Sequence, residues 1–403
     1  MDLPPKQHER GSSDPDENVS FVSQLGPILF LTTIFFLNFT GRIVFAPLLP
    51  SIENDLGIGH TEAGSLFLFV SVGYFISLLT SGFLSCRISH RRTITVSAVS
   101  VGMALLGISV SHTLWQIRFG LFFLGMAAGI YLPSGIATLT SFISVRHWGK
   151  AIATHELAPN LGFVVAPLLA EAFLIWFPWR GVIVFIGISS ILIGIVFFFF
   201  GKGGEFSGQA PNFGSLKTLF IEPAFWIMAV LFSFGICGTL GIYTMLPLYL
   251  VTAQGVNRSW ANTLVALSRI SGVFMAFLAG WMSDRMGPRL TMSCVFLITG
   301  LLTILLGAVS NAWVVLLVFL QPVMAVCFFP PGFAAISSIG PPNARNIAVS
   351  LTMPVAFIFG GGAIPIGIGM MADAGFFNLG IALAGGLILT GSLLALLLKS
   401  PQQ

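Results

Sequence analysis

Residues 280–289 read GWMSDRMGPR, and residues 82–92 read GFLSCRISHRR. Both stretches are short charged segments between long apolar runs, and in both an initial Gly is followed by an aromatic residue, Leu or Met, and Ser. They differ at the fifth position, which is Asp284 in one and Cys86 in the other. The repetition bears on the fold, and the difference bears on function.

A single offset of 280 − 82 = 198 residues relates the two stretches. The same offset relates three pairs of residues, which are Gly82 and Gly280, Arg87 and Arg285, and Pro167 and Pro365. Three coincidences at one offset predict that the chain consists of two duplicated halves.

Composition indicates what surrounds the apolar runs. The chain has 403 residues, of which 56% are hydrophobic and 8% are charged, whereas a soluble chain has about a quarter of its residues charged. So few charges cannot cover water-soluble domains, but helices in lipid need no such cover. We therefore expect a polytopic membrane protein whose main partner is the lipid bilayer. The formal net charge of +4 does not indicate binding to nucleic acid.

Apolar stretches of about 20 residues, the length that crosses a bilayer as a helix, recur along the chain. Helices are expected because backbone groups in hydrocarbon must be hydrogen-bonded within their own segment. The predicted spans are 24–49, 61–85, 93–111, 113–143, 150–176, 180–200, 223–251, 260–283, 290–309, 312–338, 347–371 and 376–398. The predicted fold is an all-α membrane protein with twelve transmembrane helices in two pseudo-symmetric six-helix bundles. Such parallel repeats are typical of transporters with a site between the halves.

The expected organisation has four parts. They are a disordered cytoplasmic tail at 1–21, an N-terminal bundle at 22–201, a cytoplasmic linker at 202–218 and a C-terminal bundle at 219–400. With the N-terminus inside, thirteen Lys and Arg residues fall in cytoplasmic segments and only Arg180 and Arg258 fall outside. This bias predicts a multi-pass protein of the inner or plasma membrane with both termini cytoplasmic. We expect a monomer.

The chain resembles the major facilitator superfamily over residues 22–400. The stretch 280–289 is similar to the family motif found in the loops between helices 2 and 3 and between helices 8 and 9. Residues 117–119, followed by Gly125, resemble a second motif on helix 4. Residues 162–170 resemble the Gly-x-x-x-Gly-Pro-x-x-Gly pattern of proton-coupled antiporters, with alanines at the last two glycine positions. The resemblance implies secondary transport.

The two charged segments are predicted to act as cytoplasmic latches. The carboxylate of Asp284 can accept backbone N–H groups at a helix start and can pair with Arg285 or Arg289, which would favour a state closed toward the cytoplasm. Cys86 offers no such charge, so the N-terminal latch is expected to be weaker. The predicted latch residues are Gly82, Arg87, Arg91, Gly280, Asp284, Arg285, Gly287 and Arg289. In the alternative interpretation, the arginines of the N-terminal segment only determine topology.

Two arginines lie inside predicted spans, where a charge costs about 3 kcal/mol on insertion scales. Arg42 and Arg269 come from opposite halves at similar depth, and no carboxylate lies at matching depth on an adjacent turn of either helix. A guanidinium presents a planar fork of donors that suits a carboxylate or another oxyanion. We predict that the two arginines share one anion site. The alternative for Arg42 is a structural pairing with a helix C-terminus or with a periplasmic acid such as Glu53.

Other polar groups of the spans are predicted to contribute to the same site. Arg269 resembles the helix 8 arginine of the monocarboxylate and oxalate/formate porters, although the helix 1 signature of those porters is absent. Tyr74, Tyr131 and Asn160 are predicted to bind the substrate as cavity-lining donors. Core packing is the alternative for the two tyrosines.

An acid and an imidazole are adjacent on the fifth predicted span. His155 and Glu156 lie in its inner half, and a carboxylate beside a histidine in low dielectric could carry a coupling proton. A pairing of Glu156 with Arg146 or Lys150 is the alternative. The family resemblance implies a structural or proton-relay role for Arg118 on helix 4.

No enzyme constellation, phosphate loop or metal-ligand spacing is present in the sequence. We therefore predict no enzymatic activity, no cofactor and no metal site, and transport driven by an ion or solute gradient. The predicted function is secondary transport of a small anion, an organic carboxylate, by proton symport or exchange for a counter-anion. The alternative is a proton-driven exporter of amphipathic compounds, which the 39 phenylalanines favour. The two arginines disfavour it, because exporters of cations need membrane-embedded acids.

Overall fold

The structure is a computed structural model that describes residues 21–208, 220–310, 312–337, 339 and 342–398. Every regular element among these residues is a helix, as the sequence predicts. The predicted tail lies outside the described residues except for residue 21, and so does the predicted linker from residue 209 onward.

The N-terminal half has nine α-helices among the described residues. They are α1 (Phe21–Ile43), α2 (Phe45–Leu56), α3 (His60–Ile88), α4 (His90–Ser109), α5 (Leu114–Gly129), α6 (Tyr131–Ser141), α7 (Trp148–His155), α8 (Leu157–Leu174) and α9 (Trp179–Phe200). A 3₁₀ turn, η1 (Val145–His147), precedes α7. Local sequence places some boundaries: the Thr113 hydroxyl accepts from the backbone N–H of Gln116, whose side chain accepts from Thr113 N–H in return, and this capping box starts α5.

The C-terminal half has ten described α-helices. They are α11 (Pro223–Ile236), α12 (Ile242–Thr252), α13 (Arg258–Ser268), α14 (Gly272–Met286), α15 (Pro288–Ala308), α16 (Ala312–Ala325), α17 (Phe329–Ile336), α18 (Pro342–Ala356), α19 (Ile364–Asp373) and α20 (Phe377–Leu396). Three short segments join some of them end to end, namely the π-helical η3 (Cys237–Gly241) and η5 (Phe357–Ala363) and the 3₁₀ turn η4 (Val326–Phe328).

Eleven spans among the described residues are long and apolar enough to cross a membrane, and each corresponds to a predicted span. The predicted span 260–283 differs, because the structure divides it into α13 and α14. Between them, the backbone N–H groups of Arg269 and Ile270 bond to carbonyls three residues back instead of four. This tight turn is the kind of interruption that often marks a hinge. Counting α13 and α14 as one crossing gives the twelve predicted.

The duplication is visible in backbone geometry at the two charged segments. Ser89, between α3 and α4, has φ 75° and ψ 158°, and Gly287, between α14 and α15, has φ 81° and ψ 154°. These two residues are again 198 apart. Each carbonyl accepts a hydroxyl bond from a threonine four residues on, Thr93 at 2.7 Å and Thr291 at 2.8 Å. The offset read from sequence therefore relates equivalent turns.

This turn conformation predicts opposite effects of two substitutions on stability. Only glycine adopts these φ and ψ values readily, and another residue pays about 1–3 kcal/mol in backbone strain. We expect Gly287→Ala to destabilise the protein and Ser89→Gly to stabilise it, the second by less because glycine gains entropy when unfolded. Thermal unfolding of the purified protein in detergent measures both. Gly280→Ala is the control, since a Cβ there has no atom within 4 Å. Equal changes in melting temperature for Gly280→Ala and Gly287→Ala would show that residue 287 is not strained by a side chain.

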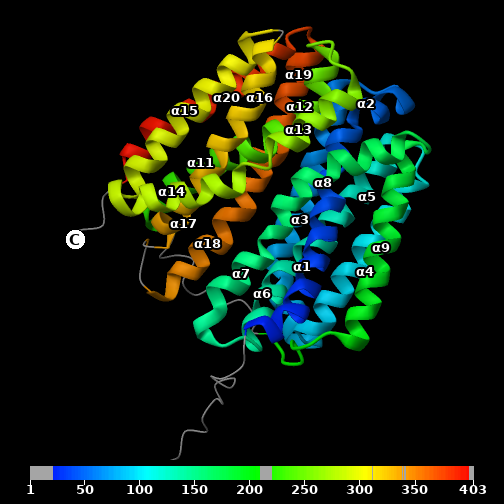
Figure 1. Cartoon of the computed structure of the whole chain (residues 1–403), viewed down its shortest axis with the longest axis vertical. Helices are drawn as coiled ribbons and strands as arrows, with labels where there is room; N and C mark the ends of the chain where they lie inside the picture. Colours follow the sequence, from blue (N-terminus) through cyan, green and yellow to red (C-terminus); the bar gives the residue numbers. More distant parts are fainter. Residues whose placement is uncertain (1–20, 209–219, 311, 338, 340–341, 399–403) are drawn as a thin grey trace, which may run out of the picture.

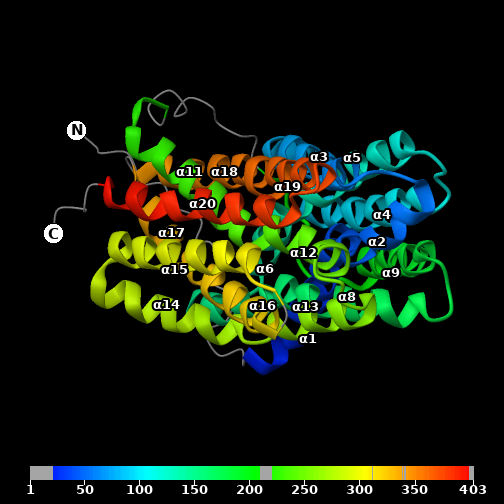
Figure 2. The ribbon, with the colours of Figure 1, turned by 90° about the horizontal axis from the view of Figure 1, so that it is seen from above.

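The halves lie side by side and meet mainly at one end. Figure 2 shows α4 and α9 toward one edge and α14 and α15 toward the other, with α8, α12 and α13 between them. Contacts between halves are concentrated in the pairs α3–α19, α3–η5, α2–α12 and α8–α13. In Figure 1 the helices α2, α12 and α19 meet at the top, whereas α6 and α7 lie at the bottom. We call the end with residues 56–60 and 373–377 the far end, and the end with Ser89 and Gly287 the turn end.

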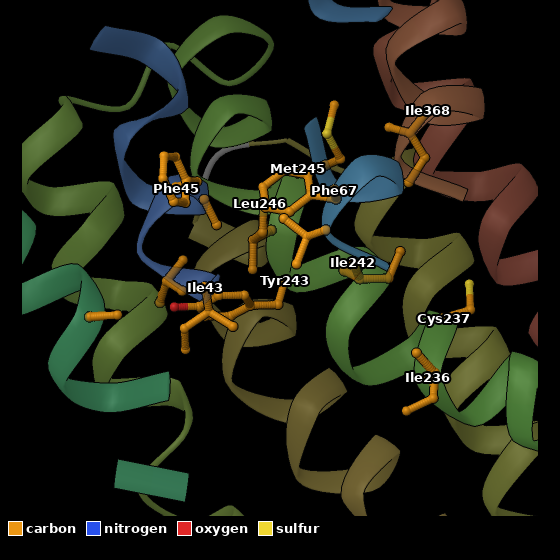
Figure 3. Packing of buried hydrophobic residues seen from close by; sticks show 14 of the residues in the cluster. Ile43, Phe45, Phe67, Ile236, Cys237, Ile242, Tyr243, Met245, Leu246 and Ile368 are labelled. Atoms are coloured by element: carbon orange, nitrogen blue, oxygen red, sulfur yellow. The ribbon is translucent and has the colours of Figure 1, made fainter. Parts of the chain in front are cut away.

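A continuous apolar cluster joins the halves in the middle of the bundle. Figure 3 shows Ile43 and Phe45 of the N-terminal half with Tyr243, Met245 and Leu246 of the C-terminal half, all of them buried. This packing places the start of α2 against α12. The junction between α1 and α2 is thereby held next to the C-terminal half.

Candidate functional site

Arg42 lies in the last turn of α1 with 7% of its surface exposed. Its guanidinium carbon is 4.4 Å from the centroid of the Tyr74 ring and 5.2 Å from that of Phe39. Its Nε has no hydrogen-bond partner among the described residues. Aromatic faces stabilise a cation, but neither Tyr74 nor Phe39 carries a negative charge that would neutralise Arg42. The buried guanidinium therefore keeps its capacity to bind an oxyanion.

A small cavity of about 30 Å³ borders Arg42, which is room for roughly two water molecules. Residues of both halves line it, including Arg42, Ser71 and Tyr74 from one half and Leu240, Thr244, Phe357 and Gly361 from the other. The Phe357 ring packs on Tyr74 with centroids 5.2 Å apart. An organic substrate therefore needs helices of the two halves to separate at this point.

Arg269 lies at the interruption between α13 and α14. Its Nη2 donates to the carbonyl oxygen of Thr239 at 3.0 Å, and its Nε has no partner among the described residues. The guanidinium carbon is 4.8 Å from the Phe163 ring and 4.9 Å from the Tyr243 ring. Because the helix is interrupted here, the side chain turns toward η3 of the same half and α8 of the other.

Four aromatic rings connect the two arginines, and we call Phe39, Tyr74, Phe163 and Tyr243 the aromatic box. The Phe39 and Phe163 rings meet at 5.0 Å, and the Phe163 and Tyr243 rings meet at 4.7 Å. The hydroxyl of Tyr243 is buried without a partner among the described residues.

The two arginines thus share an aromatic wall, although only Arg42 borders the small cavity. Neither arginine forms an ion pair with a described carboxylate, and the Glu53 considered for Arg42 instead pairs with His60. Sequence reasoning missed Phe39 and Phe163, and the one available signal was the spacing of Phe39 three residues before Arg42, which places them on one helix face.

His155 is completely buried between α1 and α6. Its ring stacks on Phe35 with centroids 4.6 Å apart, and its Nε2 lies 3.0 Å from the Tyr131 hydroxyl. That hydroxyl donates to the carbonyl oxygen of Leu31 at 2.7 Å. Since the carbonyl can only accept and the phenol has one proton, Nε2 must donate to Tyr131. Nδ1 is the ring nitrogen that Tyr131 does not engage, and Glu156 Oε1 lies 3.5 Å from it.

This cluster changes the placement of several predicted site residues. Tyr131 is fully buried and engaged with His155, so it does not border the cavity at Arg42 as predicted. Asn160 donates to the backbone carbonyl of Glu156 at 2.9 Å. This bond supplies a partner for a carbonyl at the junction between α7 and α8. The Glu156 side chain is 48% exposed and contacts His155, and it pairs with neither Arg146 nor Lys150 among the described residues.

Arg118 lies apart from His155. It donates from Nε and Nη2 to the Ser65 hydroxyl at 3.1 and 2.8 Å, and its guanidinium carbon is 4.8 Å from the Trp115 ring. Thirteen residues of helix, roughly 20 Å, separate it from Tyr131. The surroundings of Arg118 are those of a structural side chain that fastens α5 to α3.

The predicted pairing of Asp284 with Arg285 or Arg289 does not occur among the described residues in this conformation. Asp284 is exposed and has no hydrogen bond or ion pair with another described residue. Arg285 lies over the Trp281 ring at 4.5 Å, and Arg289 donates to the Leu396 carbonyl. In the other half, Arg91 pairs with Glu205 at 2.6 Å. The latch made by Asp284 stays a prediction for a state in which the turn end is closed.

The far end carries polar contacts between the halves that the sequence did not reveal. Asp373 at the end of α19 accepts from the first turn of α3, from His60 N–H at 2.8 Å and from Thr61 N–H and hydroxyl at 2.9 and 2.5 Å. The helices approach so closely that a Cβ on Gly64 would lie 2.4 Å from the Pro365 carbonyl oxygen.

A second contact across the far end joins α8 to α13. Glu171 Oε1 accepts from Asn262 at 2.6 Å and pairs with Arg258 at 3.1 Å. Asn262 also donates to the Pro47 carbonyl at 3.3 Å. We call Asp373, Glu171 and their partners the far-end gate, and in this structure that gate is closed.

Comparisons with known proteins agree with this architecture. The family model described as "Major Facilitator Superfamily" matches residues 31–351 and 255–403. "Membrane sensor protein UhpC" of Escherichia coli strain K12 is 24% identical over 322 residues, 72% of this chain and 71% of that protein. "Cis,cis-muconate transport protein" of Acinetobacter baylyi is 22% identical over 374 residues, 88% of this chain and 89% of that protein. An inward-facing, unoccupied bacterial homolog of the human lysosomal transporter Spinster aligns with a TM-score of 0.83 and 15% identity, covering 94% of this chain and 97% of that one.

Proposed function

Because this chain belongs to the Major Facilitator Superfamily, and is thus a multi-pass membrane transporter, we propose that it carries a small organic anion by alternating access. Proton symport or exchange for a counter-anion drives the transport. Both termini lie on the cytoplasmic side of the cell's inner or plasma membrane, and the protein acts as a monomer.

One observation carries the anionic assignment. Arg42 and Arg269 come from opposite halves, each has a buried Nε without a partner, and neither has a carboxylate counter-ion among the described residues. A guanidinium in the middle of a membrane protein costs several kcal/mol. Such a charge is usually found where it binds a ligand or pairs with a protein acid. A carboxylate arriving with the substrate supplies the missing counter-ion. The relative named for muconate transport is consistent with a carboxylate cargo.

A thermal-shift screen of the purified protein tests this function. Monocarboxylates, dicarboxylates, nitrate, sulfate and phosphate are added separately, and the screen is repeated with Arg42→Ala and Arg269→Ala. A ligand at 100 times its Kd stabilises by about 2.7 kcal/mol, so we expect one class of anion to raise the melting temperature of the parent protein alone. If only amphipathic cations stabilise it, the protein is an exporter instead.

Flux in proteoliposomes completes this test. The stabilising anion is expected to accumulate inside vesicles when a proton gradient or an opposing anion is supplied. Binding without flux would indicate a sensor, the role named for the UhpC relative, and would refute the transport proposal.

We further propose that the His155–Glu156 pair holds the coupling proton. Tyr131 fixes Nε2 as a donor, which leaves Nδ1 and the Glu156 carboxylate to share one exchangeable proton at 3.5 Å. We expect Glu156→Gln to abolish uptake driven by a pH gradient while counterflow exchange continues. Glu205→Gln, which removes an exposed carboxylate at the same end, is the matched control. Equal loss of both transport modes in Glu156→Gln would show a structural role.

A further inference from the structure

A lateral groove lies on the surface of the N-terminal half, and it shares no residue with the cavity at Arg42. Its volume is about 560 Å³. It lies between α3 and α4, with α5 as its floor. Its lining includes Ser77, Thr80 and Leu84 of α3, Ser100 and Met103 of α4, and Met126 of α5.

The groove follows from the local sequence as well as from the fold. The helices α3 and α4 are joined by the turn at Ser89, and both pack along α5 while touching one another much less. The space between them stays open because Ser77 and Ser100 are small. At the offset of 198 the equivalent residues are Met275 and Ile298. The groove is therefore a feature of the N-terminal half that the duplicated sequence does not repeat.

The lining of the groove is suited to hydrocarbon. The Thr80 hydroxyl donates to the Ile76 carbonyl of its own helix at 2.9 Å, so its proton needs no acceptor from a ligand. Met103 is 63% exposed and Phe123 is 58% exposed. These residues lie on membrane-spanning helices, so lipid chains cover them. Apolar contact alone gives no preference for one lipid, since bulk lipid tails are equally apolar.

Positive charge at the turn end of the groove gives a preference for anionic over neutral lipids. Arg87 lies three residues beyond Leu84, roughly 4.5 Å of helix rise, and Arg92 lies in the first turn of α4. Both side chains are exposed, and neither has a hydrogen bond or ion pair with another described residue. Arg91 is already paired with Glu205. Cys86 stands where the other half has Asp284, so this turn lacks the acid that could neutralise Arg87.

We propose that an anionic phospholipid binds here, with its phosphate on Arg87 and Arg92 and one acyl chain in the groove. The lipid supplies the negative charge that Cys86 does not. It also fills the space between α3 and α4 and so supports the segment in which Ser89 holds a strained turn.

Competition between two lipids measured by native mass spectrometry tests this site. Phosphatidylglycerol and phosphatidylcholine with identical chains are titrated into the full-length protein in detergent. Two arginines near an anionic headgroup predict about 10- to 30-fold tighter binding of phosphatidylglycerol. We expect the double variant Arg87→Gln/Arg92→Gln to lose this preference. Ser100→Phe, which fills the groove, is expected to lose it too.

Two control variants separate the site from general effects of charge and size. Lys150→Gln removes an exposed charge at the same end, and Val196→Phe enlarges a side chain that is 42% exposed on α9; both should keep the preference. If Ser100→Phe does not fold, Met103→Trp enlarges an exposed side chain in the same groove. Equal binding of the two lipids by the parent protein overturns the proposal. A preference for phosphatidylglycerol that remains after the groove is filled also overturns the proposal. In that case the arginines attract the lipid although its acyl chain does not bind in the groove.

Discussion

Replacing Arg42 by glutamine is expected to weaken binding of the carried anion by about 10- to 150-fold, which corresponds to the roughly 1.5–3 kcal/mol of a hydrogen bond to a charged group. Arg42 is 7% exposed, and its guanidinium lies beside the rings of Tyr74 and Phe39. No described protein acid competes with the substrate. Arg42→Lys should retain part of the affinity, because it keeps the charge and loses the planar fork. Isothermal titration with the anion identified by thermal shift measures the change.

The control for this loss is Arg118→Gln. Arg118 is also a partly buried arginine beside an aromatic ring, but two of its donor nitrogens, Nε and Nη2, already bond to Ser65. Its replacement should leave anion affinity within about threefold. A double-mutant cycle of Arg42 and Arg269 adds a geometric test, since residues that share one ligand are not additive. Strict additivity would show that the two arginines do not meet on the same anion.

Replacing Asp373 by alanine is expected to open the far end in a larger fraction of molecules. The carboxylate accepts three hydrogen bonds from the start of α3 in the other half, where it acts as a helix cap supplied from outside the helix. Loss of such a cap costs about 1–2 kcal/mol, which shifts an equilibrium by about 5- to 30-fold. Only the state with a closed far end contains this contact. Its loss therefore destabilises that state alone and shifts the equilibrium toward the open state.

Labelling from the far side measures that shift. Ser71→Cys places a thiol at the cavity in a background lacking the four native cysteines, and an impermeant reagent is applied to oriented vesicles. Asp55→Asn is the matched control, since Asp55 is also a carboxylate at the far end but bonds to Trp179 and Arg180 within its own half. Equal labelling of the Asp373→Ala and parent proteins would refute the role of the gate.

The fold was accessible from sequence because the constraint behind it is local. A backbone in lipid must satisfy its own hydrogen bonds, so each apolar run of sufficient length is a helix. The offset of 198 likewise required only comparison of the chain with itself, and the matched turns at Ser89 and Gly287 confirm it. The division of the eighth span at Arg269 was not predictable in this way. At this division Arg269 bonds to Thr239, which is 30 residues away in η3, and the sequence alone does not bring these two residues together.

The candidate site was accessible only in part. A charge in an apolar run is conspicuous whatever its surroundings, so Arg42 and Arg269 could be selected without a structure. Tyrosines are ambiguous, because a buried phenol needs a partner whether or not it lines a cavity. Tyr74 contacts Arg42, whereas Tyr131 is directed to His155. The far-end gate was invisible because Asp373 and Glu171 look like ordinary carboxylates at helix ends.

The sequence by itself determined that this chain spans a membrane as two duplicated helical halves and that two of its buried charges lack acids nearby along the chain. These results follow from composition and from comparison of the chain with itself. The surrounding lipid and the need for backbone hydrogen bonds act on each segment separately. Only the tertiary structure decided which aromatic rings face the two arginines, which carboxylates close the far end, and where a groove opens between α3 and α4. Those contacts join residues tens to hundreds of positions apart, and their geometry depends on how the helices pack.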